Sequence, residues 1–110
     1  MLTNMYNAYM DTGLLNNLAD SMIEYILREL ANFSELDTDT IRRIKSAKIY
    51  LDHKDNKNYE LRIGMGISEA SFLFSGKKVS GSIGGNIERL VSYWLTRPLN
   101  QAVLAAILKS

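Results

Sequence analysis

The sequence has 110 residues, 13 Lys and Arg against 12 Asp and Glu, a formal net charge of +1 and no cysteine. The lack of cysteine excludes a disulfide-stapled scaffold, a thiolate metal site and a cysteine nucleophile. No apolar run approaches the roughly 20 residues of a membrane helix, and the first residues lack the pattern of a signal peptide. We therefore expect one cytoplasmic domain over residues 1–110, with no membrane association.

Charge is unevenly distributed along the chain. Residues 1–40 carry seven acidic side chains and one basic one, whereas residues 41–110 carry twelve basic and five acidic ones. Such a split can steer association, either within the chain or between subunits.

The first elements expected are helices. A short helix is predicted at residues 2–10, where apolar residues recur at helical spacing. Asp11 or Thr12 is then predicted to cap a longer helix, because its side-chain oxygen can accept from the free first-turn N–H groups. The apolar stripe of this longer helix consists of Leu15, Leu18, Met22, Ile26, Leu30 and Phe33. A further short helix is expected after the polar segment SELDTDT, with Asp37 or Thr38 as its cap.

The period of the apolar pattern then changes to two, which indicates strands. Alternating residues at 47–52 and 59–63 flank the turn-forming stretch KDNKN, so they predict a β-hairpin. A third strand is expected at EASFLF, residues 69–74, and a weaker fourth at VSGSI, residues 79–83. These segments predict a meander of three or four antiparallel strands.

Two helices are expected to close the chain. Asn86 is a candidate cap for a helix at 86–97, whose apolar face would contain Ile87, Leu90, Val91, Trp94 and Leu95. Pro98 suits the first turn of a second helix. That helix is apolar around nearly its whole circumference, which predicts that it is buried in the core or against a partner. The fold class is therefore α+β.

The glycine-rich loop before residue 86 is the strongest candidate for a ligand site. It lacks the Lys-Ser/Thr pair of a phosphate-binding P-loop, and its glycines do not have the spacing of a dinucleotide fingerprint. A helix N-terminus does present free N–H groups to an anion, but a plain strand-to-helix connection explains the glycines without a ligand and is the favoured interpretation. The candidate ligand-binding residues are Lys77, Lys78, Gly81, Ser82, Gly84, Gly85, Asn86 and Arg89.

The sequence offers no recognisable catalytic centre. His53 is the only histidine and sits beside a predicted hairpin turn, without the partners that a triad or a zinc site needs. The serines lack a nucleophile motif. We therefore expect no catalytic residue, metal or cofactor, and the sequence leans against an enzyme.

Two other surfaces are candidates for binding. The Met and Tyr residues of the first ten positions are expected to pack onto the same domain or, alternatively, to form a partner face, since both residue types are enriched in protein interfaces. Together with the apolar C-terminal helix they give a predicted interface for a homo-oligomer or a second protein domain, made of Met5, Tyr6, Tyr9, Met10, Leu104, Ile107 and Leu108. Nucleic-acid binding is the less favoured alternative for the basic segment at 42–62, through Arg42, Arg43, Lys45, Lys48, Lys54 and Arg62.

The C-terminal third also carries a family resemblance. The element order and the tail SGSIGGNIERLVSYWLTRPLNQAVLAAILKS resemble the enolase-N-terminal-like domain of uncharacterised prokaryotic proteins, in which it precedes a Rossmann-like domain described as heavy-metal chelating. The sequence lacks that second domain, and the resemblance assigns no catalytic residue to this chain. It implies an accessory domain that shapes a cleft with another domain or subunit.

The function that these observations favour is a non-catalytic interaction module, which self-associates or docks on a partner. A small-anion or small-ligand binding domain that uses the glycine-rich loop is the alternative.

Overall fold

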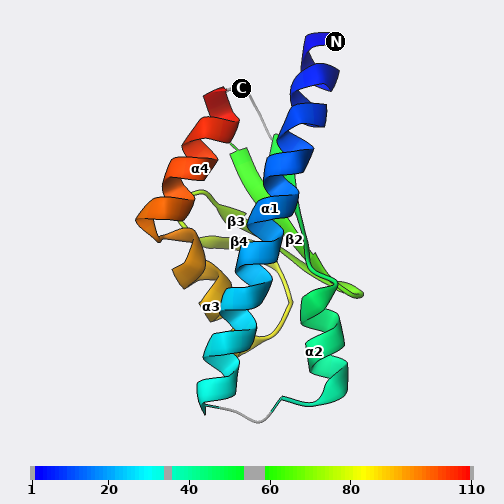
Figure 1. The fold of residues 1–110 in the computed structure, drawn as a ribbon, viewed down its shortest axis with the longest axis vertical. Helices are drawn as coiled ribbons and strands as arrows, with labels where there is room; N and C mark the ends of the chain where they lie inside the picture. The colour runs from blue at the N-terminus through cyan, green and yellow to red at the C-terminus, as the bar shows by residue number, and fades with distance from the viewer. Residues whose placement is uncertain (1, 34–35, 54–58, 110) are drawn as a thin grey trace.

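The computed structural model describes the backbone of residues 2–33, 36–53 and 59–109, and side chains within residues 13–32, 36–51 and 59–107. It confirms the α+β class, with an antiparallel sheet between N-terminal and C-terminal helices (Figure 1). The elements are α1 (Leu2–Phe33), α2 (Thr38–Lys45), β1 (Lys48–His53), β2 (Tyr59–Met65), β3 (Ser68–Leu73), β4 (Lys78–Gly81), α3 (Gly85–Leu95) and α4 (Pro98–Lys109).

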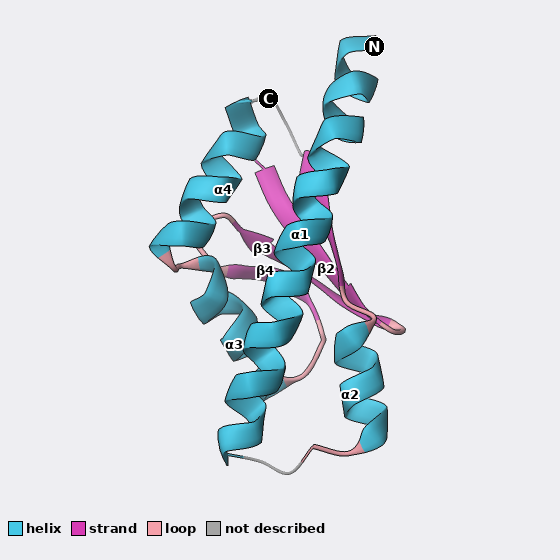
Figure 2. Cartoon of the chain, viewed as in Figure 1, coloured by secondary structure: helices cyan, strands magenta, loops and turns pink. Residues whose placement is uncertain are grey.

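The sheet is the predicted meander, with four strands in the order β1-β2-β3-β4 (Figure 2). All three strand pairs are antiparallel, and the register aligns Ile49 with Ile63 and Ile63 with Ala70. These side chains are buried, whereas Lys48, Tyr50 and Glu69 of the alternate positions are exposed. The helices therefore cover one face of the sheet and leave the other face open.

Helix α1 differs from the prediction of two helices. It runs without a break through 32 residues, which corresponds to about 48 Å at 1.5 Å per residue and matches the 45 Å long axis of the molecule. Asp11 and Thr12 lie inside this helix and do not cap a second one. A cap residue stabilises a helix end but does not create one, and Gly13 costs only about 1 kcal/mol inside a helix.

A single cluster of buried apolar side chains joins α1 to the sheet and to the C-terminal helices. The predicted stripe on α1 supplies five of its members, from Leu15 to Leu30, and the predicted face of α3 supplies five more, from Ile87 to Leu95. The largest side chains of the cluster, Trp94 and Phe72, are at most 1% exposed. The periodicity of the sequence therefore identified the inner faces of both helices.

The start of α2 confirms Asp37 as its cap. The Oδ1 atom of Asp37 accepts a hydrogen bond of 2.6 Å from the backbone N–H of Thr40. This interaction holds the pKa of the Asp37 carboxyl below its ordinary value, because the bond favours the charged form. Helix α2 then packs against α1 and β2, with Ile44 fully buried.

The start of α3 differs from the prediction. Gly84, not Asn86, is the N-cap, and it makes no side-chain cap bond because glycine has no side chain. Asn86 is the second residue of the helix. The chain can turn into the helix at Gly84 because φ there is +136°, a value that residues with a side chain rarely adopt.

Side chains of α4 cap the end of α3. The Nδ2 of Asn100 donates to the carbonyl of Trp94 at 2.7 Å, and the Nε2 of Gln101 donates to Leu95 and Phe74 carbonyls, both at 2.6 Å. Two of these bonds go to carbonyls in the last turn of α3, which have no partner within the helix. Helix α3 ends at Leu95, two residues before the predicted end. Pro98 begins α4, as predicted.

Helix α4 is only half buried, whereas its composition predicted burial on all sides. Leu104 and Ile107 face the core at 1% and 2% exposure. Leu99 is 80% exposed, and Ala102, Ala105 and Ala106 are also exposed. One apolar face of α4 therefore has no cover within the described part of the chain.

No helix among the described residues is both long enough and apolar enough to cross a membrane.

Truncation to alanine should change the free energy of unfolding much more on the buried face of α4 than on its exposed face. Leu104→Ala should lower the free energy of unfolding by about 2–5 kcal/mol, because it removes a buried side chain and leaves a cavity. Leu99→Ala should change it by less than about 0.5 kcal/mol. Urea unfolding followed by circular dichroism measures both, and equal losses would contradict the two-faced arrangement.

Candidate functional site

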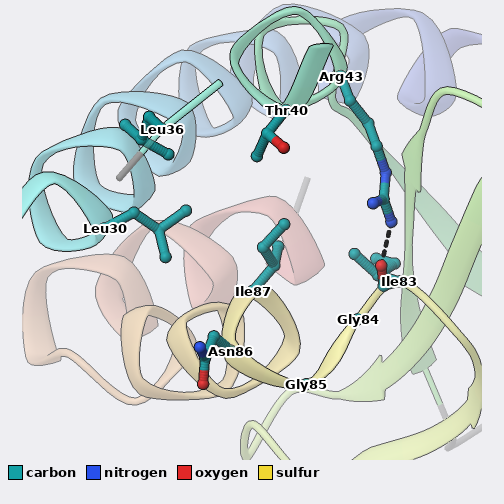
Figure 3. Close-up of a pocket in the computed structure, with 9 residues that line it drawn as sticks. All are labelled: Leu30, Leu36, Thr40, Arg43, Ile83, Gly84, Gly85, Asn86 and Ile87. Atoms are coloured by element: carbon teal, nitrogen blue, oxygen red, sulfur yellow. Dashed lines mark hydrogen bonds between the residues drawn. The ribbon is translucent and has the colours of Figure 1, made fainter. Parts of the chain in front are cut away.

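A pocket of about 260 Å³ lies where the C-terminal end of α1, helix α2 and the start of α3 meet. The view in Figure 3 shows Leu30 and Leu36 on one side, Thr40 and Arg43 reaching down from α2, and the loop before α3 on the opposite side. The lining residues are Leu30, Leu36, Thr40, Arg43, Ile83, Gly84, Gly85, Asn86 and Ile87.

The position of the loop is fixed at the peptide groups of Ile83. Its carbonyl accepts a hydrogen bond from the guanidinium of Arg43, and its N–H donates to Oε1 of Glu88 at 3.1 Å. The second oxygen of Glu88 pairs with Nζ of Lys78 at 2.9 Å. Because the side chain of Ile83 is also buried, at 3% exposure, the loop is attached to α2, β4, α3 and the core.

These contacts determine the charge state of Glu88. Burial disfavours the carboxylate and would raise its pKa, but the bonds from Lys78 and from the N–H groups of Ile83 and Gly84 outweigh burial. The pKa of Glu88 therefore lies below its ordinary value of 4.5. A carboxylate in the first turn of α3 also interacts favourably with the positive end of the helix dipole.

Two glycines leave the loop side of the pocket open. A Cβ atom added to Gly84 or to Gly85 would meet nothing within 4 Å. The backbone of the loop is therefore directly accessible, and the first N–H groups of α3 have no partner within the helix. The predicted loop residues Gly84, Gly85 and Asn86 all line the pocket.

The other predicted ligand residues lie elsewhere. Lys78 pairs with Glu88, and Lys77, Ser82 and Arg89 are exposed side chains that do not line the pocket. Gly81 has a structural explanation, because a Cβ there would lie 2.3 Å from the carbonyl oxygen of Glu69. The structure therefore brings together three of the eight predicted residues.

The sequence interpretation missed the α1 and α2 side of the pocket. Thr40 and Arg43 are three residues apart on α2, so they project from one face of that helix. The sequence feature that could have identified Arg43 as a pocket residue is its position next to Ile44, the one buried residue of α2. Which distant segment this face would meet depends on tertiary packing, which the local pattern does not report.

The basic segment does not form one uncompensated patch. Arg42 pairs with Asp39 at 3.7 Å, and Arg62 pairs with Glu69 at 3.3 Å and lies 4.8 Å above the ring of Tyr50. Arg43 is directed toward Ile83, Lys45 and Lys48 are exposed, and Lys54 lies outside the described residues. This distribution weakens the case for nucleic-acid binding, which needs uncompensated cations along one surface.

The predicted interface residues also differ in their surroundings. Leu104 and Ile107 belong to the core of the domain itself. The remaining residues of that set lie within α1 and α4, where their side chains are outside the described part; they are Met5, Tyr6, Tyr9, Met10 and Leu108. An interface on α4 would therefore use its exposed face, which begins at Leu99.

Among the described residues, no group of three or more His, Asp and Glu side chains is placed to hold a metal ion. Comparisons with protein-family models, with curated proteins and with solved structures found no match to this chain.

The contacts of Glu88 predict a pH dependence of stability. Because its pKa is lower in the folded state, the carboxylate stabilises the fold above pH 4.5, and this contribution is lost as the pH falls through the folded-state pKa. Glu88→Gln should therefore be less stable than the natural sequence at pH 7, by about 1 kcal/mol or less because Lys78 is half exposed.

The same difference should shrink toward zero at pH 3, as measured by urea unfolding over this pH range. Glu69→Gln is the matched control, since its partner Arg62 and Glu69 itself are both exposed. A pH-independent effect of Glu88→Gln, or an equal effect of Glu69→Gln, would contradict the role assigned to Glu88.

The two glycines at the ends of the loop predict contrasting effects of alanine. Gly81→Ala should destabilise the fold by more than about 1 kcal/mol, because φ is +95° and the new Cβ would collide with the backbone of β3. Gly85→Ala should be neutral or stabilising by up to about 1 kcal/mol. Thermal unfolding distinguishes them, and an equal loss at both positions would contradict the distinction.

Proposed function

We propose that this chain is a non-catalytic interaction module that forms a homodimer through the exposed face of α4. The observation that carries the proposal is the exposure of Leu99, at 80%, on a helix that has no charged residue from Pro98 to Leu108. A helix that is apolar on all sides is ordinarily covered on all sides. Depletion of charge is also typical of the centre of protein interfaces.

The pattern of side-chain sizes on this face supports a second copy as the partner. The large side chain of Leu99 lies at one end, and the small side chain of Ala106 lies two turns later, with Ala102 between them. If two copies of α4 pack antiparallel across a two-fold axis near Ala102, Leu99 of each copy faces Ala106 of the other. Such self-complementarity is what a two-fold interface requires.

The resemblance to the enolase-N-terminal-like domain supports the same class of function, because it implies an accessory domain that meets another domain or subunit.

A charge placed on the small-residue end of the face tests the proposal. Ala106→Glu should convert the dimer to a monomer, because it would bury an unpaired carboxylate opposite Leu99. Helix propensity changes little between Ala and Glu, so the fold should be retained. Sedimentation velocity at micromolar concentration measures the oligomeric state, and circular dichroism checks the fold.

Asn17→Glu is the matched control, since it introduces the same charge at an exposed position of α1. It should leave the dimer unchanged. A natural sequence that is monomeric over the whole concentration range, or a dimer that survives Ala106→Glu, would refute the proposal.

A further inference from the structure

The pocket between α1, α2 and α3 suggests a second property, which does not depend on the proposed dimer. We infer that this pocket binds a small organic carboxylate: the guanidinium of Arg43 receives the carboxylate, and apolar side chains receive a short aliphatic body.

The charge of Arg43 has no carboxylate partner within the described residues. The side chain is partly buried, and its hydrogen bond goes to the neutral carbonyl of Ile83. Four other described cations have carboxylate partners: Arg28 pairs with Glu24, Arg42 with Asp39, Arg62 with Glu69 and Lys78 with Glu88. Described cations without such a partner, such as Lys45 and Lys48, are exposed to water, whereas Arg43 is partly buried. Within the described residues no carboxylate pairs with Arg43, and a partly desolvated charge without a counterion favours an anion.

The geometry of this side chain strengthens the argument. The bond to Ile83 holds the guanidinium at the wall of the pocket, and Figure 3 shows it extending from α2 toward the loop. An arginine that is already positioned loses little rotamer entropy on binding, and its planar fork matches the two oxygens of a carboxylate. The Nε atom of Arg43 is buried and has no hydrogen-bond partner among the described residues, so the carbonyl of Ile83 does not satisfy the whole group.

The wall of the pocket opposite Arg43 is apolar. Leu30 and Ile87 line the pocket at 4% and 8% exposure, and Leu36 is half-buried beside them. Sites for small organic ligands combine such walls with a few polar groups that orient the ligand. The polar group beside Arg43 is the hydroxyl of Thr40, which Figure 3 shows on the same side of the pocket.

The combination of one charged wall and one apolar wall favours one class of ligand over two others. A phosphate or sulfate ion could bind the guanidinium of Arg43 but would make no contact with the apolar wall at Leu30 and Leu36. A neutral aliphatic molecule would fill the apolar wall but leave the charge of Arg43 uncompensated. A carboxylate with a short chain satisfies both walls, and its charge can also interact with the nearby N-terminus of α3. Asp37 caps α2 on the exposed side and does not line the pocket.

Three probes separate these chemistries on the full chain. Hexanoate carries both features, 1-hexanol carries the tail without the charge, and inorganic phosphate carries charge without the tail. Chemical shifts of the backbone amides of Gly84, Gly85 and Ile87 report binding in ¹H–¹⁵N spectra. Hexanoate should produce saturable shifts at these amides and should bind at least about tenfold more tightly than either other probe.

Variants then assign the binding to the pocket. Arg43→Gln should weaken hexanoate binding by about tenfold or more, because it removes a charged hydrogen-bond donor. Arg42→Gln is the matched control, since it makes the same charge change at the adjacent exposed arginine and should have no effect. Gly85→Val adds a side chain in open space at the pocket wall, so it should block binding without disturbing the fold.

If Arg43→Gln does not fold, Gly85→Val still tests whether hexanoate binds in this pocket. Hexanoate binding that survives Gly85→Val would overturn the inference, as would an equal loss in Arg42→Gln. Equal affinity for 1-hexanol or phosphate, or the absence of a saturable shift with hexanoate, would overturn it as well.

Discussion

The attachment of Ile83 to two charged side chains is the constraint on which the arrangement of sheet, α2 and α3 depends. Arg43 of α2 binds its carbonyl, and Glu88 of α3 accepts from its N–H. A residue between a strand and a helix normally leaves such groups to water, because no regular ladder reaches them. Here the two bonds join α2 and α3 to the same connecting residue, and Ile83 lies in the wall of the pocket between those helices.

Side-chain hydrogen bonds to backbone groups also hold the C-terminal end of α3. Asn100 and Gln101 of α4 cap its final carbonyls, and Gln101 also binds the carbonyl of Phe74 next to β3. These bonds fix the rotation of α4 about its own axis, which places Leu104 in the core and Leu99 in the open. The exposed apolar face of α4 therefore follows from specific polar bonds, and the helix cannot bury that face by rolling without breaking them.

The elements of this fold could be predicted from the sequence where one local pattern decided them. The stripe on α1, the meander and the cap at Asp37 are of this kind. The start of α3 was not predictable from cap preference, because Asn86 is a good cap but Gly84 alone permits φ of +136°. The continuity of α1 through Asp11 was missed because a residue that can cap a helix is also tolerated inside one. The meeting of Arg43 with the glycine loop depends on tertiary packing, which the spacing of residues does not encode.

The two proposed binding surfaces use different parts of the molecule. Figure 1 shows the start of α3, the end of α1 and α2 gathered toward one end of the long axis, whereas α4 extends toward the other end. A partner on the exposed face of α4 would therefore leave the pocket accessible. Arg43 links the pocket to the fold, however, because the guanidinium that would receive a carboxylate also holds Ile83. Any anion bound there would add a charged partner to a residue that joins α2 to the loop before α3, and ligand binding would then stabilise the folded state that contains this contact.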